Sequence, residues 1–578
     1  MGAFMLVSNR FLENPSTRGK RAIREAMRRQ GHLVQAEINT QNHLLFLSSK
    51  RYRPLQLWQS PNSDDFCAGV GTFFNRNREG PESLSSLYAR FSIEHPLRFT
   101  LSGTFCLIVF KQGRLYVIQD RLGLYQIFTN SELGIWSNLL VSLALVTPRL
   151  SPSRQGLYEY IFRGASFGGD SVVKEIKRLR GNFIAQLEPT VHRHPRSPPL
   201  DLGTKQPPDV VCLENCLTRL RELFKEIAQI YGDSITCALS GGYDTRLMLA
   251  LLLESGVRPK LYTYGRPSSP DLKTAHLIVQ RLKLELDHFD REVEPLPSLD
   301  EFPGLVDRNF MAFDGCPEQG ILDNGMDLKT RLQRAQSGGL VLNGGGGEIF
   351  RNFWELPDRE LSPRDFIISC YGTYDPRITT SQFCEEEYLE NFEKKILKEL
   401  DLRGNGLLSR EAIEQLYPRY RCKYWMAKNH AINLRFTESL LPFLHYNVID
   451  AAMRVPVTFK FHGRFQANLI SLINPDLAAL PSSYGHPLTP RGRPLYKRMG
   501  SQVVMHAPPG IRQFGLHSFI RYRDWNRPSI LEMEFVKAIM EPDFPTLSKY
   551  IFSGKVRNNR TFNRICTLEY FYQKVGVR

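Results

Sequence analysis

Short apolar segments of β-type composition dominate the first third of the chain. Residues 43–47, 105–110 and 114–118 are rich in Leu, Ile, Val and Phe and are bounded by polar positions. The last two are separated by Lys111, Gln112 and Gly113, a pattern that predicts a hairpin with a three-residue loop. We therefore expect antiparallel sheets with a few helices over residues 1–195.

The hydrophobic period changes after a proline-rich stretch, which predicts a linker over residues 196–209. Beyond it, strands at 235–239 and 260–264 alternate with helices at 247–253 and 275–284. This alternation predicts an α/β, doubly wound parallel sheet within a second domain, residues 210–578. From about residue 360 the pattern is mostly helical and ends in a basic, aromatic-rich tail. A first helix is indicated by apolar residues at helical spacing, namely Leu213, Leu217, Leu220, Phe224 and Ile227.

Length and composition support a globular protein of two or more domains. The chain has 578 residues, 42% of them hydrophobic and 23% charged, with a net charge of +16. Lys and Arg are scattered, which favours solvated faces and a polyanionic ligand such as ATP over a nucleic-acid surface. The ten cysteines lack zinc-type spacing and predict reduced thiols in a cytoplasmic protein. Neither a signal peptide nor a membrane-spanning segment is expected.

The stretch Ser240, Gly241, Gly242, Tyr243, Asp244, Thr245 lies between a predicted strand and a predicted helix. Glycine amides at a helix N-terminus collect anions, and the two hydroxyls add donors. An acid such as Asp244 fits a phosphate loop only if a divalent cation joins it to the phosphates. A Walker loop would carry a lysine, which is absent, so the pattern indicates a pyrophosphate-holding loop. The alternative is a tight turn with a capping Asp or Thr.

A second glycine-rich turn follows the apolar stretch Leu340–Leu342. Asn343 and four glycines lead to Glu348. Ordering four glycines is entropically unfavourable, so this turn predicts a second wall of the same site rather than a plain loop. Glu348 is then a candidate to share a metal with Asp244 or to act as a base. Residues 264–275 form a third element, a strand-to-helix connection with Pro270 near the helix start.

Taken together, these segments resemble the asparagine synthetase family of ATP-pyrophosphatase amide ligases. Residues 240–245 match its S-G-G-x-D-S loop, and 269–275 and 341–350 resemble the two segments that follow the next strands. Residues 440–456 are similar to the stretch that closes the site. Residues 101–123 resemble the attached glutaminase domain, so the similarity spans most of the chain in the right order.

The resemblance implies that a substrate carboxylate attacks the α-phosphorus of ATP with Mg²⁺, and that an amine then displaces AMP from the acyl-adenylate. The expected partners are a small-molecule or peptide carboxylate and an amine or ammonia donor, and a homodimer is one possible assembly. By carry-over, Asp244 holds the magnesium ion, while Glu348 is the candidate for a second metal ligand and for the catalytic residue. The remaining implied nucleotide-binding residues are Leu239, Ser240, Gly241, Gly242, Thr245, Tyr264, Gly265, Asn343 and Gly344.

This chain departs from the family in four places. Residue 2 is Gly2 and the first cysteine is Cys67, so no N-terminal thiol can form a glutamine thioester, and we expect a degenerate glutaminase-like half. The second turn reads one residue shorter and lacks its Asp, with Glu348 as the replacement. His445 stands where an Asp is usual. The phosphate-contacting R-x-K after Pro481 is missing, which leaves as candidates Arg491, Arg493 and Lys497.

The leading hypothesis is therefore an ATP-dependent carbon–nitrogen ligase without its own glutaminase activity. Two versions stay open: ammonia acting on an aspartate-like acid to give asparagine, or an internal amine closing a lactam. The second version is typical of the related β-lactam synthetases and lasso-peptide cyclases. A non-catalytic scaffold with a vestigial nucleotide site is the alternative from another class, and a tRNA-modifying enzyme is a further one.

Overall fold

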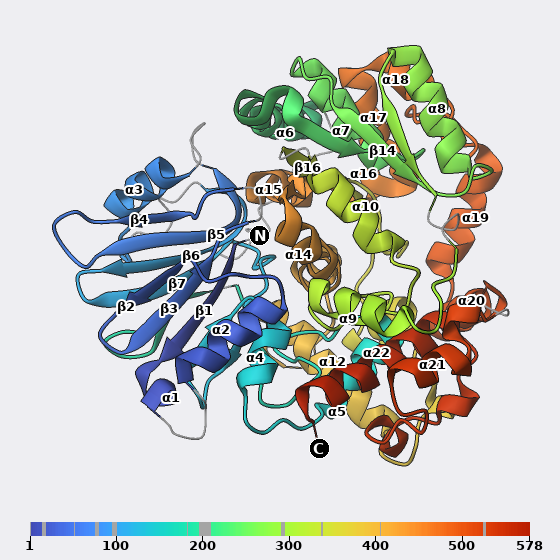
Figure 1. Cartoon of the computed structure of the whole chain (residues 1–578). Helices are drawn as coiled ribbons and strands as arrows, with labels where there is room; N and C mark the ends of the chain where they lie inside the picture. Colours follow the sequence, from blue (N-terminus) through green and yellow to red (C-terminus); the bar gives the residue numbers. More distant parts are fainter. Residues whose placement is uncertain are drawn as a thin grey trace.

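The computed structural model describes residues 2–13, 19–50, 53–74, 80–94, 101–181, 183–195, 210–290, 295–336, 339–404, 406–523 and 527–577. The chain is an α/β protein with two six-stranded antiparallel sheets and one five-stranded parallel sheet (Figure 1). The predicted linker, residues 196–209, lies outside the described residues. Our division into domains stays a prediction, because one continuous apolar core joins both halves of the chain.

The amino-terminal half is a sandwich of the two antiparallel sheets. One sheet has the order β10 (Lys177–Arg178), β8 (Phe128–Asn130), β9 (Ile135–Ser137), β1 (Ala3–Ser8), β3 (His43–Ser48), β2 (Ala36–Asn39). The other has the order β12 (His192–Pro195), β11 (Phe183–Gln186), β7 (Arg114–Gln119), β6 (Ser102–Lys111), β5 (Phe66–Phe74), β4 (Leu57–Gln59).

Both faces of β1 are covered, which explains its unbroken apolar sequence. Phe4 and Leu6 face the second sheet across the sandwich interior. Met5 and Val7 pack on the other face against α2 (Gly19–Arg29) and α4 (Leu140–Val146). Side chains alternate along a strand, so burial on both faces removes the polar alternation of a half-exposed strand. Helix α3 (Pro81–Arg90) covers the outer face of the second sheet.

The predicted hairpin forms, but its loop has two residues and not three. Lys111 still pairs with Arg114 in the β6–β7 ladder, which leaves Gln112 and Gly113 as the turn. Both have positive φ, 53° and 73°. This backbone is typical of the type I′ turn, whose twist matches that of the flanking strands.

The parallel sheet has the order β15 (Leu286–Phe289), β14 (Lys260–Tyr264), β13 (Ile235–Ala238), β16 (Leu340–Leu342), β17 (Glu438–Leu440). The chain runs outward in one direction from β13 to β15 and in the other from β16 to β17. The strand order therefore reverses between β13 and β16, where α/β sheets bind ligands. Strand β17 was missed by the sequence prediction, since it is only three residues long and lies within a mostly helical region.

The helices predicted before β13, after β13 and after β14 are present. They are α6 (Val210–Tyr231), α7 (Tyr243–Glu254) and α8 (Pro270–Leu282). Helix α8 begins at Pro270, and the Ser269 hydroxyl caps it by accepting from the N–H of Leu272 at 3.2 Å.

The basic, aromatic-rich residues predicted at the end of the helical region form the largely buried helix α22 (Asn559–Val575). It packs against α5 (Arg154–Arg163) of the amino-terminal half (Figure 1). Arg564 on α22 donates to the carbonyls of Ile161 and Phe162 at 3.3 and 3.2 Å. The aromatic residues of this segment are therefore core residues.

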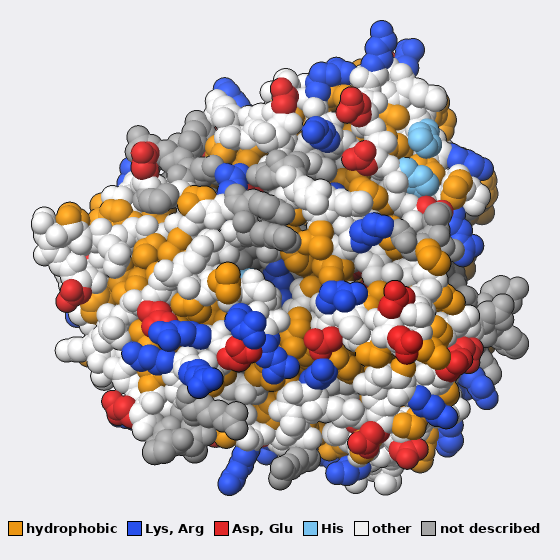
Figure 2. All heavy atoms as spheres, in the orientation of Figure 1, with side chains coloured by type: hydrophobic (Ala, Val, Ile, Leu, Met, Phe, Trp, Pro, Cys, Tyr) orange, Lys and Arg blue, Asp and Glu red, His pale blue; other side chains and the backbone are white. Residues whose placement is uncertain are grey.

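Basic side chains on the face drawn in Figure 2 are dispersed, with acidic ones among them. This agrees with the scattered Lys and Arg of the sequence. Within the described ranges, no helix combines the length and the apolar character that crossing a bilayer requires.

Candidate functional site

The loop after β13 is closed on itself by the Thr245 side chain. The Thr245 hydroxyl accepts from the N–H of Ser240 at 3.0 Å and lies 3.2 Å from its carbonyl. The N–H of Gly242 turns inward to the Ser240 hydroxyl at 3.3 Å. The loop is therefore a preformed turn at the N-terminus of α7.

One loop amide already donates to an anion. The N–H of Gly241 donates to the carboxylate of Asp271, in the first turn of α8, at 2.9 Å. A carboxylate oxygen and a phosphate oxygen are similar acceptors, and a helix N-terminus favours either. The contact shows that the Gly241 N–H is oriented toward an oxyanion, which in this structure is the Asp271 carboxylate.

The second glycine turn packs directly against the first. A Cβ built on Gly347 would lie 2.5 Å from the Asp244 Oδ1, and one on Gly344 would lie 3.2 Å from the Thr245 nitrogen. Gly346 has φ 94°, which a residue with a side chain rarely adopts. The two turns can approach this closely because β13 and β16 are neighbouring parallel strands whose carboxyl ends share one edge. The structure thus brings together the two elements that the sequence paired.

Asp244 and Glu348 lie on either side of the Arg351 guanidinium. Arg351 donates to both Asp244 oxygens at 3.1 and 2.8 Å and lies 4.0 Å from Glu348. Gln466 donates to Asp244 at 2.9 Å, and the Tyr417 hydroxyl donates to Glu348 at 2.5 Å. The carboxylates of Asp244 and Glu348 therefore both approach the Arg351 guanidinium at the N-terminus of α7.

Burial raises the pKa of Asp244 to about 6. The positive charge of Arg351 opposes this rise, the negative charge of Glu348 adds to it, and the hydrogen bond from Gln466 opposes it. Burial also raises the pKa of Tyr417 well above its usual range. Tyr417 therefore stays protonated and donates a hydrogen bond to Glu348. Perturbed carboxyls that face a cleft are a common property of functional sites.

Residues 477–484, which begin in α18 (Pro475–Ala479), cover the loop. Arg246 is fully buried and donates to the carbonyls of Leu477, Leu480 and Pro481 at 3.2, 2.8 and 2.7 Å. The N–H of Ser483 then donates to the Gly241 carbonyl at 3.2 Å. Arg246, in the first turn of α7, thus anchors the cover to the same helix that carries Asp244.

These elements enclose a cleft of about 460 Å³. Arg493 and Lys497 lie on its wall, as two of the three proposed replacement cations, while Arg491 is absent from the lining. Lys497 donates to the Tyr484 carbonyl, in the covering segment. The lining comprises Tyr243, Asp244, Glu348, Arg351, Asn352, Phe353, Glu355, Phe461, His462, Gly463, Tyr484, His486, Arg493, Lys497, Ser501 and Met505.

Several residues implied by the resemblance lie beside this cleft and not on its wall. Leu239 is buried, and its N–H donates to the Tyr262 carbonyl at 2.8 Å. Tyr264 and Gly265 are at the end of β14, where Gly265 donates to Phe289 at 3.3 Å. The residues outside the lining of the cleft are Leu239, Ser240, Gly241, Gly242, Thr245, Tyr264, Gly265, Asn343 and Gly344.

Four residues in or beside the cleft were missed by the sequence prediction. Three of them contact Asp244 or Glu348, namely Arg351, Tyr417 and Gln466, and the fourth is His462 on the cleft wall. Arg351 has a weak signal, since it follows Glu348 by three residues and so shares a face of a helical turn. Tyr417 and Gln466 have no such signal, because distant segments carry them to the site. His462 has φ 58°, a strained conformation for histidine that is typical of functional sites.

The amino-terminal end of the chain holds no exposed thiol. Gly2 is buried at the start of β1. Cys67 is buried in β5, and burial raises the pKa of its thiol to about 12, so it stays protonated. His445 is half-buried; it contacts the Ser102 hydroxyl at 3.2 Å and does not line the cleft.

No family model and no curated protein matches this chain. Among solved structures it is distantly similar to a glutamine phosphoribosylpyrophosphate amidotransferase from B. subtilis complexed with ADP and GMP, with 10% identity over 56% of this chain and 96% of that chain. The TM-score is 0.24. A structure of the allosteric regulatory enzyme of purine biosynthesis is similar with 10% identity over 52% of this chain and 87% of that one, with a TM-score of 0.23. Likenesses this distant carry no argument about activity.

Proposed function

We propose that this chain is an ATP-dependent ligase that activates a carboxylate as its adenylate and passes it to an amine. The observation that supports this most is the meeting of two glycine turns, Asp244 and Glu348 at the point where the strand order reverses. Pyrophosphate needs donors and positive charge, and a reacting amine needs a proton acceptor. The loop beside the cleft offers the donors, and the cleft lining offers positive charge at Arg493 and Lys497 and a proton acceptor at Glu348.

In this proposal the loop holds the leaving pyrophosphate. The Gly241 amide exchanges its Asp271 partner for a phosphate oxygen, and the hydroxyls of Ser240 and Thr245 add donors. Arg493 and Lys497 supply positive charge from the opposite wall. The carboxylate oxygen forms a bond to the α-phosphorus as the bond to pyrophosphate breaks. The amine then attacks the acyl carbon, AMP leaves, and the amine proton passes to Glu348.

In this proposal Asp244 and Glu348 would hold a magnesium ion; both carboxylates approach one positive charge, that of Arg351, in the structure. Mg²⁺ is commonly bound by one or two carboxylates together with phosphate oxygens. When bound, it would neutralise phosphate charge. In the described ranges, no group of three or more His, Cys, Asp or Glu residues is placed to hold a metal ion. A magnesium ion at this site would therefore need phosphate oxygens as further ligands.

The test measures pyrophosphate release from ATP by the full chain with candidate acids and amines. Aspartate with ammonium should give asparagine and pyrophosphate in the ammonia-dependent version, and no turnover there removes that version. Lactam formation from a substrate that carries its own amine would then identify the ring-closing version. Asp244→Ala should lower release at least about a hundred-fold, whereas the exposed control Glu360→Ala should not.

If no candidate acid supports pyrophosphate release and the chain does not bind ATP, a non-catalytic scaffold with a vestigial nucleotide site is the better explanation. Glutamine should not replace ammonium as nitrogen donor, because Gly2 and the protonated Cys67 provide no nucleophile. Salt-sensitive tRNA binding would instead favour the tRNA-modifying alternative.

A further inference from the structure

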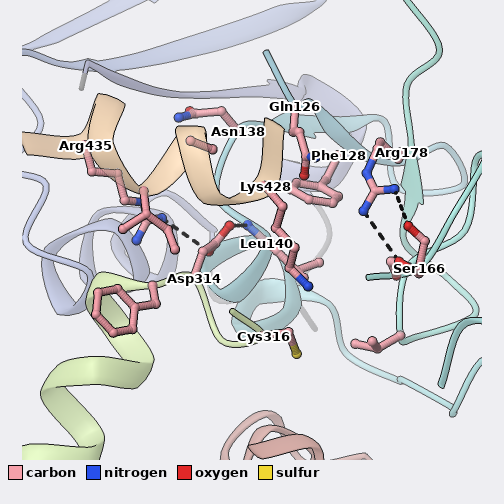
Figure 3. Close-up of a pocket in the computed structure, with 15 residues that line it drawn as sticks. Gln126, Phe128, Asn138, Leu140, Ser166, Arg178, Asp314, Cys316, Lys428 and Arg435 are labelled. Carbon is pink, nitrogen blue, oxygen red and sulfur yellow. Dashed lines mark hydrogen bonds and ion pairs between the residues drawn. The ribbon is translucent and has the colours of Figure 1, made fainter. Parts of the chain in front are cut away.

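A second, smaller cavity of about 40 Å³ lies between the amino-terminal sandwich and the later helices. Figure 3 shows Arg178 and Ser166 on one side, Asp314 and Arg435 on the other, and Lys428 in the middle of the view. It shares no lining residue with the cleft at Asp244. This cavity is therefore separate from the site of the proposed ligase activity.

The single carboxylate of this cavity is already fully used. Asp314 accepts from the N–H groups of Leu140 and Val141 at 2.9 and 3.0 Å, which begin helix α4. It also accepts from the Gln30 amide at 2.9 Å and pairs with Arg435 at 3.3 Å. Asp314 and Arg435 thus neutralise each other, which leaves two further cations in the lining.

Those cations are Arg178 and Lys428, and neither forms an ion pair within the described residues. Arg178 is only 7% exposed and donates to the Ser166 carbonyl at 2.9 Å and its hydroxyl at 3.4 Å. Its buried Nε has no partner. Lys428 has one long hydrogen bond, to the Gly164 carbonyl at 3.3 Å, and lies 4.5 Å from the centre of the Tyr160 ring.

Nearby acids do not compensate these charges. Glu159 and Asp170 attract Arg178 electrostatically, but both are paired with Lys395, at 2.7 and 2.8 Å. Burial lowers the pKa of Lys428 to about 8, so it remains mostly protonated at neutral pH. Arg178 is thus buried and Lys428 half-buried in one lining, and neither charge has an ion-pair partner in the part of the chain that the structure describes.

We propose that this cavity binds a small inorganic oxyanion, of the size of phosphate or sulfate, between Arg178 and Lys428. The volume exceeds the roughly 10–15 Å³ that one water needs, and it is far too small for a nucleotide. Guanidinium and ammonium groups are the side chains that recognise oxyanions. Because Arg178 belongs to the amino-terminal half and Lys428 to α14 (Ala427–Phe436), the anion ties the two halves together.

The experiment follows thermal unfolding of the full chain in sodium phosphate and in sodium chloride at equal ionic strength. The wild-type midpoint should rise with phosphate to a plateau and exceed the value in chloride. In Lys428→Met the apparent Kd for phosphate should weaken at least ten-fold. Lys428→Arg, which keeps the charge, and the exposed control Lys394→Met should retain the shift.

A phosphate ion could also bind at the Ser240 loop, so Thr245→Val is included. If phosphate binds in the cavity, Thr245→Val keeps the rise of the unfolding midpoint in phosphate. If phosphate binds at the loop instead, Thr245→Val loses that rise and Lys428→Met retains it. An equal shift in chloride, no saturable shift, or an unchanged shift in Lys428→Met overturns the proposal. If Lys428→Met is poorly folded, isothermal titration calorimetry of phosphate into Arg178→Met decides, and wild-type affinity there also overturns it.

Discussion

Replacing Asp244 by Asn should stabilise the free protein at neutral pH while it removes the proposed activity. Burial raises the pKa of Asp244 from its usual 3.8 to about 6. A shift of that size makes the ionised form about 3 kcal/mol less favourable in the folded chain than in the unfolded one above pH 6. Asn resembles the neutral carboxyl in shape, so the variant lacks this penalty.

The gain in the free energy of unfolding should depend on pH with a defined sign. Because the folded-state pKa is raised, the folded state binds more protons between pH 4 and 6, and wild-type stability falls as pH rises through that window. The gain of Asp244→Asn should therefore be about 1–3 kcal/mol near pH 8 and fall toward zero near pH 4. Taking the difference between variants cancels the titration of other groups.

Urea unfolding of both proteins near pH 8, 6 and 4.5 measures the gain, and pyrophosphate release near pH 8 measures the activity. Glu360→Gln, at an exposed position, should show neither effect. The reasoning is refuted if Asp244→Asn is less stable than wild type near pH 8, or if the gap between them is the same at all three pH values.

Three other substitutions or modifications test further parts of the structure. Gly347→Ala should lower the free energy of unfolding in urea by about 1–3 kcal/mol and reduce pyrophosphate release, because its Cβ would lie 2.5 Å from Asp244. The control Gly510→Ala has open space around the new Cβ and should leave both quantities unchanged. Arg246→Met should lower stability by about 2–4 kcal/mol and raise the KM for ATP, since three carbonyls of the covering segment lose their donor. Native protein treated with iodoacetamide near pH 8 should be labelled at the exposed Cys384 and not at Cys67, as read by mass spectrometry, and labelling of Cys67 would contradict its burial.

Local chemistry made the two glycine turns predictable. Ser240 to Thr245 combine small residues, hydroxyls and an acid between an apolar strand and an apolar helix, so their conformation depends on near neighbours in the chain. The same is true of the α8 start, where Ser269 and Pro270 are a cap and a first helical residue. The hairpin loop was predicted one residue too long, because whether Lys111 pairs with Arg114 depends on the twist of the whole ladder.

Other parts of the site depend on contacts between distant segments. Gln466 and Tyr417 reach the carboxylates from helices more than sixty residues beyond the second turn, and neither has a motif of its own. Strand β17 is too short to show a period. Asp244 is an ordinary acid in the sequence, and its raised pKa arises from burial and from the approach of Glu348.

The sequence by itself determined the strand–loop–helix unit around Ser240 and the glycine turn before Glu348, since these follow from residue size and local hydrogen bonding. It also determined that no thiol stands at position 2. Only the tertiary structure decided that the strand order reverses between β13 and β16, that Arg351 contacts both carboxylates, and that Arg178 and Lys428 line one cavity. Such pairings join residues far apart in the chain, and their energies depend on burial and distance, which no local pattern specifies.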